Sequence, residues 1–421
     1  MERRDLDGER EAHGGDGAGR ADYRDFLIPR DDPRVASFRG MGAREFATER
    51  KKHPMGKPVL ARWQELYDEP FRGVTAGGAP IPGLYDERAA AEDAAPVGAM
   101  VAAAEGVLAI LDDEERTRWC YPLDAPERRG WSNPEFILHD IGLRLEEVDD
   151  AKREALAGLV RATLSPAGVD AVQTLMRLNG HLGELTGMPR VMNEASYHTA
   201  LYGTPSETSP WGWQLFGHHV AVNVLVRGGD LVVAPLFLGA EPNRIAADDT
   251  EDLVFDRRQE LALALLGSFD DTQRRAVVAS DQMEGPELPD GRVNPLDGRT
   301  LAGAFQDNRV VPYEGLAASA MTPAQRERLV ELIDEHLVLL PDGPRRARLR
   351  SITAHLDETR ITWIGGSDRT QPFYFRIQGP TVLVEFDHHS GVWLDNEAPA
   401  TFHIHTTLRL PNGNDYGRAL L

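Results

Sequence analysis

Alternation of apolar and polar residues recurs near the C-terminus of the chain and sets the tightest limit on its fold. Side chains of a β-strand point alternately to the two faces of a sheet, so such a segment forms a strand with one buried face. Four segments are predicted to be strands in this way: 360–364, 373–377, 381–386 and 402–410. A fifth and a sixth, 219–226 and 231–238, flank the turn Gly228-Gly229 and are predicted to form a hairpin.

Helical periodicity occupies much of the remaining chain. Ser165 is expected to cap a helix that has Pro166 in its first turn. The predicted helices are 99–111, 146–164, 165–178, 257–266, 272–279, 321–340 and 345–356, and 282–307 is expected to be a loop. Helices and strands come in blocks rather than in regular alternation. The pattern therefore predicts an α+β fold, an antiparallel β-sheet covered by helices with a helical N-terminal layer.

The domain organisation follows from the same pattern. Residues 1–25 are polar and rich in Gly and are predicted to be a disordered tail. Residues 26–190 are expected to be mainly helical, and 191–421 to contain the sheet and the candidate site. The alternative is a single interwoven domain over 26–421.

Charge and cysteine content narrow the classes of function. Lys and Arg total 46 against 67 Asp and Glu, a net charge of −21, which argues against nucleic acid or an anionic membrane as partner. Cys120 is the only cysteine, so a metal would need His, Asp or Glu ligands. No apolar stretch suggests a signal peptide or a membrane span, and a cytoplasmic location is expected. The partner is expected to be a small molecule, with the oligomeric state left open.

Two histidines of the last strand are the first candidates for function. Phe402 and Ile404 alternate with His403 and His405, so both imidazoles lie on the polar face. Their Cα atoms would be roughly 7 Å apart, close enough for the rings to bind one ion. The alternative is an ordinary polar face without a ligand.

The hairpin over 373–387 supplies candidate carboxylates. A two-residue turn would pair Tyr374 with Glu385 and place both on one polar face with Arg376 and Asp387. Glu385 or Asp387 would be a metal ligand or general base, Arg376 would orient an anionic group, and Tyr374 would line the pocket. Alternatively, Arg376 and Glu385 form an ordinary cross-strand ion pair.

Further candidates precede the hairpin and follow the last strand. In Gly217-His218-His219 the alternation favours His219 as a ligand, with His218 at the strand edge and Trp213 as a pocket wall, although a packed corner explains them equally. Asp415 would support a histidine ring or belong only to a turn. His388 and His389 follow Asp387 in a turn and are weaker candidates.

These residues carry a resemblance to a known family. The matching segments are 202–205, 211–213, 217–219, 235–242, 374–380, 385–387, 403–405 and 414–417. Over residues 129–421 the chain resembles a bacterial and fungal family known as domain of unknown function 3500. The resemblance implies no activity, but it implies that the Gly-His-His, Glu-x-Asp and His-x-His segments share one domain.

The pattern as a whole favours a metal-dependent enzyme acting on a small molecule. A zinc hydrolase is slightly preferred, and an iron-dependent oxygenase with two histidines and one carboxylate is the nearest alternative. A metal-free protein that binds a small ligand is the third possibility. Glycine-rich nucleotide loops and a nucleophile elbow are absent from the sequence.

Overall fold

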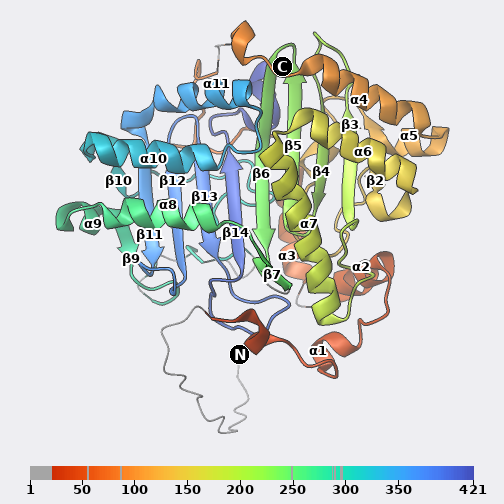
Figure 1. The fold of residues 1–421 in the computed structure, drawn as a ribbon, viewed down its shortest axis with the longest axis horizontal. Coiled ribbons are helices and arrows are strands. Elements are labelled where there is room, and N and C mark those ends of the chain that lie inside the picture. Colours follow the sequence, from red (N-terminus) through yellow and green to blue (C-terminus); the bar gives the residue numbers. More distant parts are fainter. Residues whose placement is uncertain are drawn as a thin grey trace.

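The protein is built around one large sheet (Figure 1). The computed structural model describes residues 21–421 apart from 55, 86–87, 248–249, 287, 289–290 and 294–296. Within these residues the sheet has 12 strands in the order β1-β3-β4-β5-β6-β14-β13-β12-β11-β10, with β2 beside β3 and β9 beside β11. Neighbours are antiparallel except β1 with β3 and β9 with β11. The α+β class is therefore confirmed, with a mixed but mostly antiparallel sheet.

Six strands of the sheet overlap the segments predicted from alternation, and the other six were not predicted. The helix predicted over 272–279 was wrong at its end, because residues 278–280 form a strand of the sheet. The strands are β1 Cys120–Tyr121, β2 Leu143–Arg144, β3 Tyr197–Tyr202, β4 Trp211–Gly217, β5 Val220–Arg227, β6 Asp230–Ala240, β9 Val278–Ser280, β10 Leu316–Ala317, β11 Arg360–Gly365, β12 Phe373–Gln378, β13 Leu383–His388 and β14 Ile404–Arg409. A separate ladder pairs β7 (Arg244–Ala247) with β8 (Thr250–Leu253).

Helices from both halves of the chain cover one face of the sheet. Figure 1 shows α4, α6 and α7 in front of β3 to β6, and α8, α10 and α11 in front of the strands from β14 to β10. The helices are α1 Pro33–Ala36, α2 Ala43–Lys52, α3 Lys57–Asp68, α4 Val97–Ile110, α5 Asp113–Trp119, α6 Asp150–Thr163, α7 Pro166–Thr186, α8 Asp256–Gly267, α9 Asp271–Val277, α10 Pro323–Glu335 and α11 Asp342–Thr353. Ser165 caps α7 by accepting the Gly168 N–H, as expected. No helix of the described residues is long and apolar enough to cross a membrane.

The segment predicted to be mainly helical also contributes two strands to the sheet. These are β1 and β2, and both pair with β3. The boundary at residue 190 stays a prediction. Residues 1–20 of the predicted tail lie outside the described residues, whereas Tyr23, still within that tail, is buried.

Two apolar cores lie on opposite faces of the sheet. The valines of β5, such as Val220 and Val222, point toward the covering helices and pack against them. Ala221 of β5 and Phe237 of β6 point the other way and pack against Trp63 of α3 and Phe305. The second face of the sheet is therefore covered as well, and its coverage removes large aromatic side chains from water.

The β12–β13 hairpin has a different register from the expected one. Gln378 pairs with Leu383, so residues 379–382 form the loop, and Tyr374 lies opposite Asp387 rather than Glu385. The predicted two-residue turn was wrong. The shift is an even number of residues, so each side chain keeps its predicted face, because strand side chains repeat every two residues. That polar face is buried, with Tyr374, Glu385 and Asp387 each at 0% exposure.

Candidate metal centre

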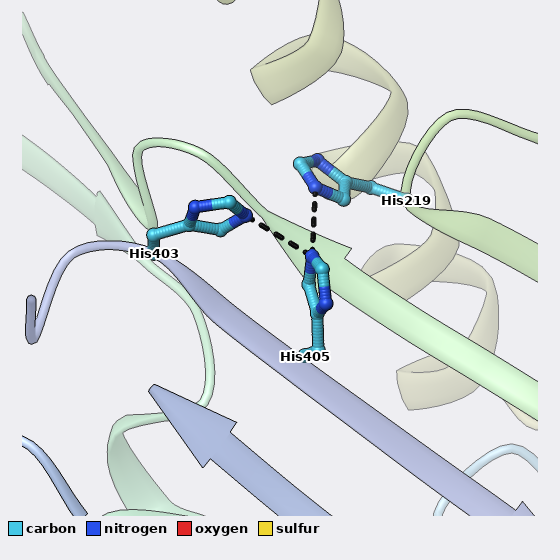
Figure 2. A group of neighbouring side chains, drawn as sticks. All are labelled: His219, His403 and His405. Atoms are coloured by element: carbon cyan, nitrogen blue, oxygen red, sulfur yellow. Dashed lines mark hydrogen bonds between the residues drawn. The ribbon is translucent and has the colours of Figure 1, made fainter. Parts of the chain in front are cut away.

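Three imidazoles converge at the end of the sheet where β6 finishes and β14 begins. Nε2 of His405 lies 3.0 Å from Nε2 of His403 and 3.3 Å from Nε2 of His219 (Figure 2). The three ligand atoms are all within 4.8 Å of one another, and all three side chains are buried. We refer to His219, His403 and His405 as the histidine triad.

The sheet positions each ring of the triad. His405 lies on β14 opposite Gly239 of β6, and His403 directly precedes the strand. His219 lies in the two-residue turn that joins β4 to β5, with a left-handed φ of 66°. Its carbonyl accepts the Gly239 N–H at 2.8 Å, which links the turn to the strand beside His405.

Gly239 leaves the space in which two of the rings meet. A Cβ at this position would lie 2.8 Å from Cδ2 of His219 and 3.0 Å from Cδ2 of His405. Carbon atoms do not approach so closely, so any side chain here would displace the rings. Glycine at position 239 therefore permits the convergence.

Hydrogen bonding determines which ring nitrogen of His403 carries the proton. Its Nδ1–H donates to the Ser390 carbonyl at 2.8 Å, which leaves Nε2 without a proton in the neutral ring. His405 Nε2 approaches two other Nε2 atoms but carries at most one proton. Only one of the two short contacts can therefore be an ordinary hydrogen bond, whereas a cation between the rings satisfies all three lone pairs.

The rings are suited to metal binding at neutral pH. Burial lowers the pKa of His219, His403 and His405 well below 6.5, and repulsion from neighbouring imidazoles lowers it further. Neutral imidazole is the form that binds a metal. A tetrahedral zinc ion with Zn–N bonds of about 2.0–2.1 Å separates its nitrogen ligands by roughly 3.3–3.4 Å. The two shorter separations in the triad are close to this value.

The triad opens onto a cavity of about 380 Å³. His219 and His405 form part of its wall, and Val59, Leu60 and Trp63 of α3 line it with apolar surface. The polar lining includes Asn133, Glu135 and Asp297, with Arg50 and His53 from the α2 region. The volume and the mixed lining are typical of a site for a small molecule.

Two partly buried carboxyl groups line the cavity. Burial raises the pKa of Asp297 to about 7, and the nearby Glu385 and Asp387 add to the effect while Arg309 opposes it. Burial also raises the pKa of Glu135, against the attraction of Arg50, whose Nε lies 3.6 Å from Glu135 Oε1. Carboxyl groups with raised pKa values can exchange protons near neutral pH.

His218 lies next to the triad but outside it. Its Nδ1 is 2.9 Å from Oδ1 of Asn179, and its ring stacks on His219 with a centroid distance of 3.8 Å. Burial lowers its pKa to about 3.

The predicted carboxylates have other partners. Glu385 accepts the backbone N–H groups of Leu301 and Ala302 at 2.8 Å and the Tyr374 hydroxyl at 2.7 Å. Asp387 accepts from the Arg299 backbone N–H at 2.8 Å and from Arg299 Nε at 2.7 Å. Both carboxylates therefore hold the loop after Asp297 against the sheet, and neither belongs to the triad.

The other predicted site residues are also engaged elsewhere. Arg376 donates to Glu314 at 3.0 Å instead of pairing with Glu385, which lies opposite it in the sheet. Asp415 accepts the Leu410 N–H and pairs with Arg409, so it does not support a histidine ring. Trp213 faces the helices, where its Nε1–H donates to Thr163, and it does not line the cavity.

Several supporting residues were missed in the sequence. Glu241 Oε1 accepts three backbone N–H groups of residues 392–394 at 2.9–3.0 Å and lies 3.8 Å from His403 Nδ1. Burial raises its pKa to about 7, and the three N–H groups oppose that effect. Asn133 accepts the His219 N–H at 3.0 Å. Glu241 lies in the family-like segment 235–242, which could have signalled it, whereas Asn133, Asp297 and Ser390 have no local pattern.

The fold and the site together define an α+β protein with a buried three-histidine group that can hold a metal ion at the edge of a cavity. Residues 93–418 match the sequence model of the family described as "Protein of unknown function (DUF3500)", and the chain belongs to this family. Comparisons with curated proteins and with solved structures gave no match.

Proposed function

We propose that this protein is a metal-dependent enzyme that activates water for hydrolysis of a small molecule. The histidine triad would hold one divalent ion, with zinc as the preferred metal. The observation that carries the proposal is the approach of three Nε2 atoms, with two separations of 3.0 and 3.3 Å, at the wall of a cavity of about 380 Å³.

The ligand set favours hydrolysis over oxygenase chemistry. Three neutral imidazoles do not neutralise the positive charge of the ion. Because of that charge, zinc in such a site lowers the pKa of bound water from 15.7 to about 7. The iron oxygenases named as the alternative use two histidines and one carboxylate. Glu385 and Asp387, the carboxylates considered for that role, are occupied by backbone amides and Arg299.

The cavity suggests roles for its other residues. Asp297 shares the cavity wall with His219 and His405, and we assign it as the carboxyl that would accept a proton from the attacking water. Val59, Leu60 and Trp63 offer an apolar surface for the body of the substrate. Glu135 and Asn133 would accept hydrogen bonds from its polar groups.

Metal analysis tests the proposal. Chelator-treated protein should bind one equivalent of Zn²⁺ by calorimetry, and His405→Ala should abolish this binding while retaining the wild-type circular dichroism spectrum. His53→Gln is the matched control, because His53 lines the same cavity but is exposed and outside the triad. If the wild type binds neither Zn²⁺ nor Fe²⁺ above background, the enzyme proposal fails and a metal-free ligand site becomes the better explanation. Binding of Fe²⁺ alone would favour the oxygenase.

A further inference from the structure

A fourth histidine, His389, lies against the triad and has no role in the site described so far. We infer that His389 is a positioning residue whose Nε2 accepts a hydrogen bond from the water on the triad metal. This inference rests on the proposed metal centre and adds to it the group that orients the water.

The backbone places the His389 ring beside two members of the triad. His389 directly follows β13, and its N–H donates to the His403 carbonyl at 2.8 Å. The centroid of its ring lies 4.9 Å from that of His403 and 4.6 Å from that of His405. The residue is 3% exposed, so its polar atoms are removed from bulk water.

One carbonyl group accepts hydrogen bonds from two imidazole rings and so determines the tautomer of each. The Ser390 carbonyl lies 2.8 Å from Nδ1 of His389 and 2.8 Å from Nδ1 of His403, and it can accept from both because it has two lone pairs. In its neutral form each ring therefore carries the proton on Nδ1 and exposes an unprotonated Nε2. The Nε2 atom of His403 faces His405, whereas that of His389 faces no hydrogen-bonding group of the described residues.

The Nε2 atom of His389 lacks a partner among the described residues. It is buried and makes no hydrogen bond with protein atoms there, although a buried acceptor without a donor is costly. Gly298 packs closely against this edge of the ring, since a Cβ there would meet Asp387 Oδ2 as well as Cδ2 and Nε2 of His389, the last two at 2.9 and 3.2 Å. A larger residue at position 298 would therefore fill the space beside Nε2. Asp297, the residue before this glycine, lines the cavity.

Distance favours contact with a bound water over direct coordination. The group of ligand atoms within 4.8 Å of one another contains the triad and not His389. An acceptor of a metal-bound water can be as far as about 4.9 Å from the ion, given a metal–oxygen bond of about 2.1 Å and a hydrogen bond of about 2.8 Å. Second-layer acceptors of this kind orient a metal-bound group without binding the metal.

The test uses the full chain loaded with zinc or cobalt. A crystal structure of the zinc protein should show an oxygen atom bound to the metal within 3.2 Å of His389 Nε2. His389→Phe, which fills the space without an acceptor, should still bind one Co²⁺. We expect the pH midpoint of its cobalt absorption spectrum to shift by at least half a unit. His389→Gln, which restores an acceptor, should return the midpoint toward the wild type. His355→Gln, at a histidine outside the cavity, should leave it unchanged.

The possible outcomes separate this inference from the proposed function. Loss of Co²⁺ binding in a folded His389→Phe protein, or His389 Nε2 bound directly to zinc, would make His389 a ligand and overturn the inference while supporting the metal centre. An unchanged cobalt spectrum in His389→Phe would assign the residue a packing role and overturn it as well. Failure of the wild type to bind any metal would refute the proposed function, and this inference with it.

Discussion

Replacing Gly239 by alanine tests whether the triad rings must meet at one point. The new Cβ would lie 2.8 Å from Cδ2 of His219 and 3.0 Å from Cδ2 of His405. Restoring an ordinary contact of 3.4 Å requires the two rings to move by about 0.6 and 0.4 Å. Metal sites tolerate errors in ligand distance of only about 0.2 Å.

The expected result is a selective loss of metal affinity. Disturbing the orientation of metal ligands typically weakens binding by about 10- to 100-fold, or about 1.4–2.7 kcal/mol, and we expect Gly239→Ala to lie in this range. Crowding in a packed region also costs about 1–3 kcal/mol of folding stability. The effect on affinity must therefore be separated from the effect on stability.

Two further glycines provide the controls. Gly229→Ala places a Cβ 2.9 Å from the Cβ of Ala94, so it crowds the β5–β6 turn without touching the triad. Gly267→Ala, at the end of α8, meets nothing within 4 Å. Zn²⁺ affinity is measured by competition with a chelator, and stability by urea unfolding of the metal-free proteins. If Gly239→Ala loses stability as Gly229→Ala does but keeps wild-type Zn²⁺ affinity, the rings do not converge on one ion and the proposed centre is wrong.

Three other predictions concern stability. Asp387→Asn removes the nearest charged partner of the buried Arg299 and leaves, among the described residues, only Glu284 at 4.0 Å. It should lower the free energy of unfolding by about 3–5 kcal/mol in urea titrations, and a loss below 1 kcal/mol would contradict the anchoring role of this pair. Zn²⁺ at 100 times its Kd should stabilise the wild type by about 2.7 kcal/mol, and His405→Ala should show no such gain in thermal unfolding. His198 is held neutral by burial and by the Arg144 guanidinium, which lower its pKa from 6.5 to about 3. The unfolded chain binds a proton there below pH 6.5 and the folded protein does not, so this contribution to stability is present above pH 6.5 and is lost as pH falls toward 3. Across that interval the free energy of unfolding should fall about 1.4 kcal/mol per pH unit less steeply in His198→Gln than in the wild type, and equal slopes would refute the assignment.

The C-terminal strands and the faces of their side chains followed from the sequence. Alternation is a local property of a strand, and it put His403 and His405 on one face and the apolar residues of β14 on the other. The hairpin over 373–387 shows how robust this is. Its predicted register was wrong by two residues, yet Tyr374 and Asp387 kept their predicted face because the strand period is two.

The composition of the site depended on tertiary structure. The polar face was predicted correctly, but the sequence could not show that the loop after Asp297 would cover it and engage Glu385 and Asp387 through Leu301, Ala302 and Arg299. These contacts join residues more than 80 positions apart, and no local periodicity encodes such a distance. His219 could be proposed as a ligand because it precedes the alternating valines, although the predicted strand start at 219 was wrong and the residue lies in the turn before β5. Its approach to His405 depends on the small size of Gly239 in a third segment. The sequence by itself thus determined which side chains share a face of the sheet, since that depends on local backbone geometry. Only the folded chain decided which of them meet, since that depends on the elements packed above them.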